Sequence, residues 1–181
     1  QTIINTNSYS NVSNQKYLVS AIVSTYNSEK YIRGCLEDLE SQTISDKLEI
    51  IVVNSGSQQN EDKIVKEFQQ RYDNIKYIHT EQRENIYQAW NRAAKIASGK
   101  YITNANTDDC HRNDAFELMV NTLESNPHVG LVYGDQIMTN TPNDTFANNH
   151  GTEELRRSEY SRQRLLFGCC TGSQPMWRRS L

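Results

Sequence analysis

The chain has 181 residues, a formal net charge of −3 and a mean hydropathy of −0.77. This length suits one domain with a substantial core, and the weakly acidic balance excludes a surface built for nucleic acid. No apolar run approaches the roughly 20 residues that cross a bilayer, so any membrane association would come from parts outside this chain. The four cysteines form no CxxC pair, which favours a reducing, cytoplasmic compartment and no structural zinc.

Residues 1–15 are polar and aperiodic, and we interpret them as a leader or linker. From Lys16 onward, short β-branched apolar runs alternate with segments whose apolar residues recur at helical spacing. The expected elements in chain order are strand 16–26, helix 27–42, strand 48–57, helix 61–72, strand 75–80, helix 86–99, strand 100–105, helix 114–126 and strand 129–137. This alternation predicts an α/β fold with a mostly parallel sheet and helices on both faces.

The pattern weakens after Met138. Residues 139–161 are polar and predict a loop or insertion, whereas residues 162–181 regain an apolar character. No cap or polar tail closes the chain, so we expect the natural protein to continue beyond Leu181.

Polar residues, with one glycine, lie at the end of each expected strand. In strand order they are Thr25, Tyr26 and Asn27, then Asn54 and Gly56, then Arg83, then Asn106, Asp108 and Asp109, and finally Asp135. The carboxyl ends of parallel strands meet at one edge of the sheet, where ligands of such folds bind. The adjacent carboxylates Asp108 and Asp109 repel each other, and a divalent cation bridging to a phosphate would relieve this repulsion. A solvated turn leading into a helix cap is the structural alternative for this stretch.

The sequence lacks the usual phosphate-cradling glycine motifs. It contains no GxxxxGKS/T and no GxGxxG after the first strand, which excludes a P-loop protein and disfavours a dinucleotide-binding protein. The charge of a bound diphosphate must then be met in another way. Asp108 and Asp109 are suited to this task by holding Mg²⁺ or Mn²⁺ against it.

Four segments together resemble one protein family. "VSAIVSTYN", "EIIVVNSGS", "IYQAWNRAAKIASGKYI" and "NANTDD", in this order, are similar to family 2 glycosyltransferases with the GT-A fold. The resemblance covers about residues 17–135 and, more loosely, 160–181. It implies a Rossmann-like catalytic domain over 16–181, with a nucleotide-binding half over 16–138 and a partial acceptor-side half over 139–181.

The resemblance also implies an activity. Enzymes of this kind transfer a sugar, with inversion, from a nucleotide-diphosphate donor to a hydroxyl acceptor, and they use Mn²⁺ or Mg²⁺. We expect a UDP-sugar donor, a saccharide or lipid-linked acceptor, and a role in cell-envelope polysaccharide synthesis.

Roles carry over position by position. The resemblance implies nucleotide binding by Thr25, Tyr26, Asn27, Asn54, Gly56, Arg83 and Asn106, metal binding by Asp108 and Asp109, and acceptor-side contacts by His111, Asp135 and Trp177. Asn54 and Asn106 stand where the family usually has aspartate. Structural alternatives remain for several of these residues. They are an ordinary aromatic at a strand end for Tyr26, core packing for Trp177, a surface salt bridge for Arg83, a helix cap or salt bridge for Asp135, and a structural role for His111.

The general base is the missing part of this prediction. In the family, this carboxylate follows the segment resembling "PMWRRSL", so we expect it beyond Leu181 and assign no catalytic base within the chain. One alternative is a sugar nucleotidyltransferase, although "TYNSEKY" lacks the expected glycine-rich basic loop. Another is a non-catalytic module that binds nucleotide sugars or glycans. Turnover of bound donor would distinguish the enzyme from the module.

Overall fold

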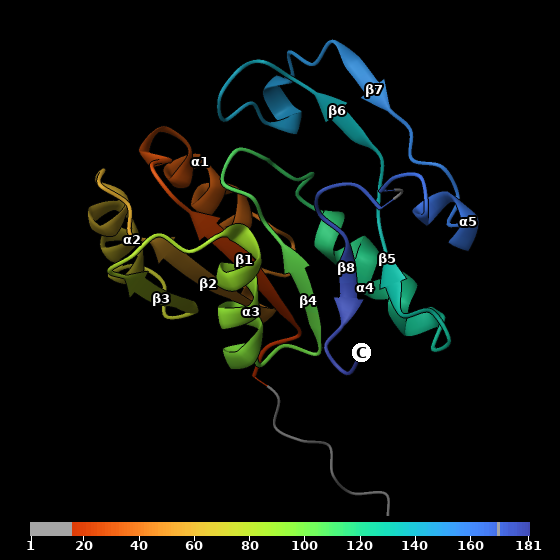
Figure 1. Ribbon diagram of the computed structural model, residues 1–181, viewed down its shortest axis with the longest axis horizontal. Coiled ribbons are helices and arrows are strands. Elements are labelled where there is room, and N and C mark those ends of the chain that lie inside the picture. Colours follow the sequence, from red (N-terminus) through yellow and green to blue (C-terminus); the bar gives the residue numbers. More distant parts are fainter. Residues whose placement is uncertain (1–15, 170) are drawn as a thin grey trace, which may run out of the picture.

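The computed structural model describes residues 16–169 and 171–181 (Figure 1). The leader expected over 1–15 lies outside the described residues. The strands are β1 (Val19–Thr25), β2 (Leu48–Ser55), β3 (Ile75–Thr80), β4 (Tyr101–Asn104), β5 (Leu131–Val132), β6 (Gln136–Met138), β7 (Glu153–Leu155) and β8 (Met176–Arg178). The helices are α1 (Glu29–Glu40), α2 (Glu61–Gln69), α3 (Ile86–Ile96), α4 (Ala115–Ser125) and α5 (Arg162–Leu165), with 3₁₀ turns η1 (Ser45–Lys47) and η2 (Phe146–Asn148).

A six-stranded sheet forms the centre, with strand order β3-β2-β1-β4-β8-β5. β3, β2, β1 and β4 run parallel, and β8 is antiparallel to both β4 and β5. Thr25 pairs with Asn54, and Asn54 pairs with His79, so the carboxyl ends of β1, β2 and β3 lie level. The predicted α/β class and mostly parallel sheet are confirmed.

The region after α4 differs from the prediction. The single strand expected over 129–137 is two strands, because the chain leaves the main sheet after Val132 and Gln136–Met138 pair instead with β7. The loop expected over 139–161 contains η2 and β7. The segment around Trp177 forms β8, which separates β5 from β4. Each ladder involves only two or three residues, too few to produce a readable periodicity.

Two hydrophobic cores lie on opposite faces of the sheet. Alternation along β1 sends Val19, Ala21 and Val23 into the larger core with α1, α2 and α4, and sends Ile22 into the smaller core with α3. The small residues Ala89, Ala93 and Ala97 line the α3 side of that smaller core. Helices therefore cover both faces, as predicted.

Local sequence also fixes the start of α3. The Asn85 side chain accepts a hydrogen bond from the Gln88 backbone N–H at 3.0 Å, and the Gln88 side chain accepts one from the Asn85 backbone N–H at 2.9 Å. This reciprocal capping box satisfies two donors that a bare helix end would leave unpaired. It sets the direction in which α3 leaves the β3–α3 loop.

The β6–β7 hairpin stands above the carboxyl-terminal edge of the sheet (Figure 1). Its connecting segment reaches α1, where the Asn143 amide donates to the Lys30 carbonyl oxygen at 2.8 Å. Gly34 allows this approach, because a Cβ at this position would lie 2.6 Å from Asn143 Oδ1. The hairpin therefore bounds one side of the strand-end edge.

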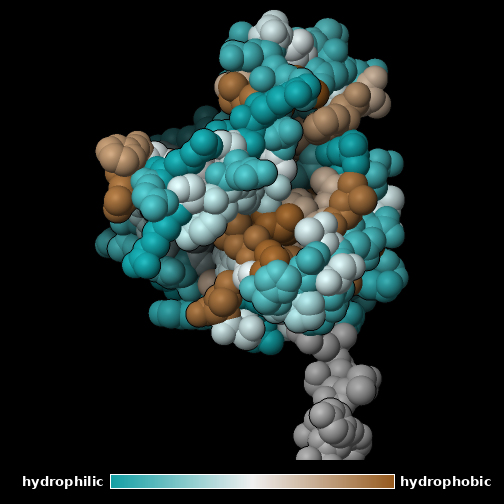
Figure 2. Space-filling model, turned by 90° about the vertical axis from the view of Figure 1, so that its right-hand side faces the viewer, coloured by the Kyte–Doolittle hydropathy of each residue, from teal (hydrophilic) through white to brown (hydrophobic). Residues whose placement is uncertain are grey.

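Hydrophobic side chains also reach the surface. Figure 2 shows the side of the molecule on which β5 and β8 lie, and hydrophobic residues gather near its middle within a polar surround. Leu131 and Leu181 are among the large hydrophobic residues that remain exposed. Within the described residues, no helix is long and apolar enough to cross a membrane.

Candidate functional site

Asn27 ties together the loops after β1 and β2. Its backbone has a positive φ of 50°, its N–H donates to Ser57 Oγ at 2.6 Å, and its side-chain oxygen accepts from the Gln58 N–H at 3.0 Å. Thr25 is buried, and its hydroxyl has no hydrogen-bond partner among the described residues. The structure therefore gives Asn27 a role in holding the loops, next to the half-buried ring of Tyr26.

Asn54 makes two side-chain hydrogen bonds at the end of β2. Its carbonyl oxygen accepts from the Ser57 N–H at 2.9 Å, and its amide nitrogen donates to the Tyr77 hydroxyl at 2.9 Å. Burial raises the pKa of Tyr77 to about 12, against the opposing effect of the Asn54 hydrogen bond. The carbonyl oxygen of this buried amide thus holds the β2–α2 turn, and its nitrogen ties β2 to β3.

Gly56 allows two loops to approach closely. Its φ is +69°, and a Cβ here would lie 3.1 Å from the Gln82 carbonyl carbon and 3.2 Å from the Arg83 nitrogen. The β3–α3 loop can consequently pass beside this glycine and carry Arg83 over Tyr26. The Arg83 guanidinium carbon lies 4.2 Å from the centroid of the Tyr26 ring, within cation–π range. Arg83 makes no ion pair within the described part of the chain, so the salt-bridge alternative finds no support.

The loop after β4 turns tightly around Asn106. The Asn106 amide donates to Asp109 Oδ2 at 3.0 Å, and the Asp109 N–H donates to the Asn106 carbonyl oxygen at 3.1 Å. Asp108 is exposed and makes no hydrogen bond or ion pair to any described residue. One carboxylate is therefore oriented by its neighbours, while the other projects unpaired beside it.

This arrangement fits a metal shared with a phosphate. No group of three or more His, Cys, Asp or Glu side chains among the described residues could hold a metal without other ligands. Mg²⁺ is typically held by one or two carboxylates together with substrate phosphates and water, and Mn²⁺ has similar ligand preferences. Asp108 and Asp109 supply that number of carboxylates at the end of β4.

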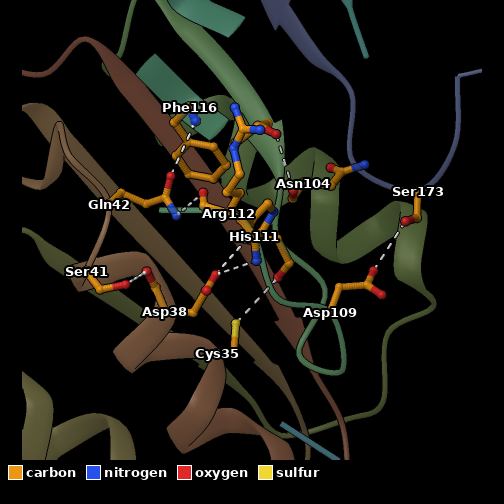
Figure 3. A network of polar contacts seen from close by, with 12 residues as sticks. Cys35, Asp38, Ser41, Gln42, Asn104, Asp109, His111, Arg112, Phe116 and Ser173 are labelled. Atoms are coloured by element: carbon orange, nitrogen blue, oxygen red, sulfur yellow. Dashed lines mark hydrogen bonds and ion pairs between the residues drawn. The ribbon is translucent and has the colours of Figure 1, made fainter. Parts of the chain in front are cut away.

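His111 is held from the side of α1 (Figure 3). Its Nδ1 lies 2.8 Å from Asp38 Oδ2, and its backbone N–H donates to the same oxygen at 3.0 Å. The imidazole also packs edge-on against Phe116, with ring centroids 4.8 Å apart. Its Nε2 is buried and has no hydrogen-bond partner among the described residues. These contacts correspond to the structural role that was the alternative for His111.

Sequence reasoning missed two polar residues that hold this segment. Asp38 lies on the buried face of α1, and the Gln42 amide donates to the Arg112 carbonyl oxygen at 3.1 Å and accepts from the Phe116 N–H at 3.3 Å. The detectable signal was an acid at Asp38, within the apolar stripe of an otherwise regular amphipathic helix. An acid placed there requires a buried partner, although its identity is not readable from spacing.

The two remaining residues predicted for the acceptor side, Asp135 and Trp177, lie in different surroundings. Asp135 lies between β5 and β6, where one oxygen accepts from the Arg157 N–H at 2.7 Å. Trp177 lies in the middle of β8, paired with Ile102 and Leu131, and packs against the smaller core. This packing corresponds to the core-packing alternative for Trp177.

A cavity of about 540 Å³ adjoins the β4 loop. It brings together Asp108, Asp109 and Asp135, which the sequence analysis had placed at strand ends, and His111, which the family resemblance had suggested. Leu118 and Met119 of α4, Ile137 of β6 and Phe146 of η2 add an apolar wall. The cavity therefore combines carboxylates at one end with hydrophobic surface at the other.

The same architecture recurs in a known family. The model of glycosyl transferase family 2 matches residues 20–181. The chain belongs to this family.

Two sequence relatives illustrate the extent of the match. An uncharacterized glycosyltransferase of Methanocaldococcus jannaschii is 33% identical over 119 residues, which are 65% of this chain and 41% of the relative. The chondroitin synthase of Escherichia coli is 31% identical over 116 residues, 64% of this chain and 17% of the synthase. This family 2 chain thus spans less than half the length of these relatives.

Solved structures share the fold. S. aureus TarS in complex with UDP superimposes with a TM-score of 0.70 at 22% identity, covering 90% of this chain and 47% of TarS. A mannosyltransferase from Pyrobaculum calidifontis, in complex with GDP-Man and Mn²⁺, superimposes with a TM-score of 0.66 at 20% identity. The match covers 90% of this chain and 44% of the mannosyltransferase. The family 2 chain therefore has the GT-A fold.

Proposed function

We propose that this chain carries the donor site of an inverting, metal-dependent glycosyltransferase that uses a UDP-sugar and a hydroxyl acceptor on a saccharide or lipid-linked glycan. The observation that carries the proposal is Asp108. This exposed carboxylate has no hydrogen bond or ion pair among the described residues, follows a strand of a family 2 fold, and lines a cavity large enough for a sugar.

Two groups in the loops after β1 and β3 support donor binding at the same edge of the sheet. The Tyr26 ring offers a flat surface beside the first strand end, and Arg83 places a permanent positive charge above it. A nucleoside diphosphate needs both kinds of contact, a stacking surface for its base and cations for its phosphates. TarS and the mannosyltransferase were solved with UDP and with GDP-Man and Mn²⁺, respectively.

The chemistry follows from charge and position. A bound Mn²⁺ or Mg²⁺ would offset the negative charge of the leaving diphosphate. Asp108 and Asp109 would hold the ion, and Arg83 would add a second cation near the phosphates. The cavity would orient the acceptor hydroxyl for attack on the anomeric carbon from the side opposite the diphosphate, which inverts the configuration. We assign no general base among the described residues.

A second candidate, a non-catalytic module that binds nucleotide sugars, has one observation in its favour. The cavity carboxylates away from the β4 loop are already engaged. Asp135 accepts from Arg157 N–H, Asp144 accepts from the Thr139 hydroxyl and His150, and Glu154 pairs with Arg156. None of them is unpaired in the manner of a general base. Family membership argues against the nucleotidyltransferase alternative.

Calorimetric titration with UDP tests the donor site. We expect binding in Mn²⁺ that weakens at least tenfold in EDTA and in Asp108→Ala, because the carboxylate contributes through the ion. Asp46→Ala, which removes an exposed acid at the opposite edge of the sheet, should bind like the unaltered chain. Equal UDP affinity in Mn²⁺, in EDTA and in Asp108→Ala would refute the metal site. Release of UDP from UDP-sugars would show that the chain is an enzyme and not a non-catalytic binding module.

A further inference from the structure

The Asp109 carboxylate receives two hydrogen bonds on one oxygen. The Asn106 amide donates to Oδ2 at 3.0 Å, and the Ser173 hydroxyl donates to the same atom at 3.3 Å (Figure 3). The other oxygen, Oδ1, has no hydrogen bond to a described residue. Two donors on one oxygen restrict rotation of the carboxylate, so Oδ1 is left for another ligand.

The direction of the Ser173 hydroxyl is itself determined by its neighbours. Arg157 lies in hydrogen-bond contact with Gln136 Oε1, and a guanidinium can only donate. This contact orients the Gln136 amide so that Nε2 faces Ser173, where it donates to Oγ at 2.7 Å. Because Ser173 accepts from Gln136, its own proton is free to point to Asp109.

Four segments distant in sequence therefore converge on one carboxylate. Asp109 lies in the loop after β4, and Ser173 lies in the segment before β8. Gln136 is the first residue of β6, and Arg157 follows β7. Each contact is partly buried, which favours persistent hydrogen bonds over exchange with water. No pattern in the sequence predicted that Ser173 would reach the strand-end edge.

We propose that Ser173 is a positioning residue for metal binding, which acts by orienting the Asp109 carboxylate and is itself oriented by Gln136. The inference rests on the proposed function, since it assumes that Asp109 ligates the ion. Partners of this kind, which orient a metal-binding carboxylate without touching the ion, alter metal affinity by about 10–100-fold when removed. The hydrogen bond of 3.3 Å is long, so we expect the lower end of this range.

Mn²⁺ affinity at saturating UDP, measured from the electron paramagnetic resonance of free Mn²⁺, is the direct readout. Ser173→Ala should bind Mn²⁺ about tenfold more weakly, whereas Ser173→Thr, which keeps the hydroxyl, should bind nearly as tightly as the unaltered chain. Gln136→Met, which keeps the side-chain length but removes the amide, should also weaken Mn²⁺ binding. Ser180→Ala removes an exposed hydroxyl near β8 and should change nothing.

A double-mutant cycle separates positioning from general damage. If Ser173 acts through Asp109, then Ser173→Ala should have no further effect on Mn²⁺ affinity in an Asp109→Asn background. UDP binding in EDTA and the thermal unfolding temperature should remain unchanged in Ser173→Ala. A full tenfold effect that persists in Asp109→Asn would overturn the inference, as would unchanged Mn²⁺ affinity in Ser173→Ala. A failure of the unaltered chain to bind UDP in a Mn²⁺-dependent way would overturn the proposed metal site itself.

Discussion

Glu49 is a fully buried carboxylate at the amino end of β2, far along the strand from the candidate site. It accepts hydrogen bonds from the Ser20 hydroxyl and, at 2.8 Å each, from the backbone N–H and the hydroxyl of Ser98, and it pairs with the Lys76 ammonium at 2.5 Å. Burial acts to raise the pKa of Glu49, but these hydrogen bonds outweigh it and lower the pKa below its ordinary value. The charged form is therefore the stable one in the folded chain.

Glu49→Gln should lower the free energy of unfolding by about 2–4 kcal/mol at pH 7, because the donors around it lose a charged acceptor. The folded pKa lies below the unfolded one, so this stabilisation is complete above about pH 4.3 and disappears as the pH falls through the folded value. Urea unfolding at pH 7 and at pH 3 should show the difference between the two proteins shrinking in acid. An equal difference at both pH values would contradict this account.

Arg83 and Tyr26 should contribute to binding in distinguishable ways. Arg83→Gln removes the charge above the ring and should weaken UDP binding about tenfold while leaving uridine affinity nearly unchanged, because uridine lacks phosphates. Tyr26→Ala removes the flat surface and should weaken both ligands. Calorimetry with the two ligands checks this, and equal losses for UDP and uridine in Arg83→Gln would exclude a phosphate role.

Sequence patterns predicted residues at strand ends better than the partners of those residues. Asp108, Asp109 and Arg83 follow strands of the sheet, and the parallel arrangement necessarily brings such positions to one edge. Asp38 and Ser173 were missed, because their importance comes from contacts between segments that only the folded chain creates. The sequence did not decide between a core position and a sugar contact for Trp177, because an aromatic residue has the same appearance in a core strand and in a binding site.

The β6–β7 hairpin is a weakly self-supporting element. Its ladder consists of the pairs Gln136–Leu155, Ile137–Glu154 and Met138–Glu153, and an isolated two-stranded hairpin is marginally stable in water. Its position over the cavity therefore depends on contacts at its two ends, with Asn143 on α1 and with Ser173 near β8.

Gly34→Ala should loosen the end of the hairpin that rests on α1. The new Cβ would lie 2.6 Å from Asn143 Oδ1 and 2.9 Å from Asn143 Cβ, so the hairpin segment must move, while alanine itself favours the helix. We expect faster amide hydrogen exchange in residues 139–150 with little change in global stability. Glu37→Ala, at an exposed position of the same helix, serves as the matched control. Unchanged exchange in Gly34→Ala would mean that Asn143 does not hold the hairpin.

Elements with many residues were predictable, and those with few were not. The apolar run of β2 and the periodic faces of α1 and α2 gave clear strand and helix signals, since eight to twelve residues repeat one pattern. β5, β6, β7 and β8 contain two or three residues each, and pairing partners decide their existence. The topology after α4 could not be read from the sequence for this reason.

At the scale of the whole molecule, the ligands should stabilise the fold together. Mn²⁺ and UDP share one site in the proposed function, so each should raise the affinity for the other by the same factor. At concentrations of 100 times the dissociation constant, binding stabilises by about 2.7 kcal/mol, which corresponds to about 5–10 °C in the unfolding temperature of a domain this size. Scanning calorimetry should show this shift with both ligands and its loss on adding EDTA. A full shift with UDP and EDTA would contradict the coupling.

The position of β8 has a consequence for synthesis of the chain on the ribosome. β8 lies between β4 and β5 although it follows both of them, and the entire hairpin, in sequence. The unit β3-β2-β1-β4 can pair once β4 has emerged, but β5 has no partner until β8 is translated. During that interval β4 presents a row of unpaired backbone groups, which is the template that recruits foreign strands. The protein should therefore be most vulnerable to aggregation, and most dependent on chaperones, in the interval between the emergence of β4 and the emergence of β8 from the ribosome.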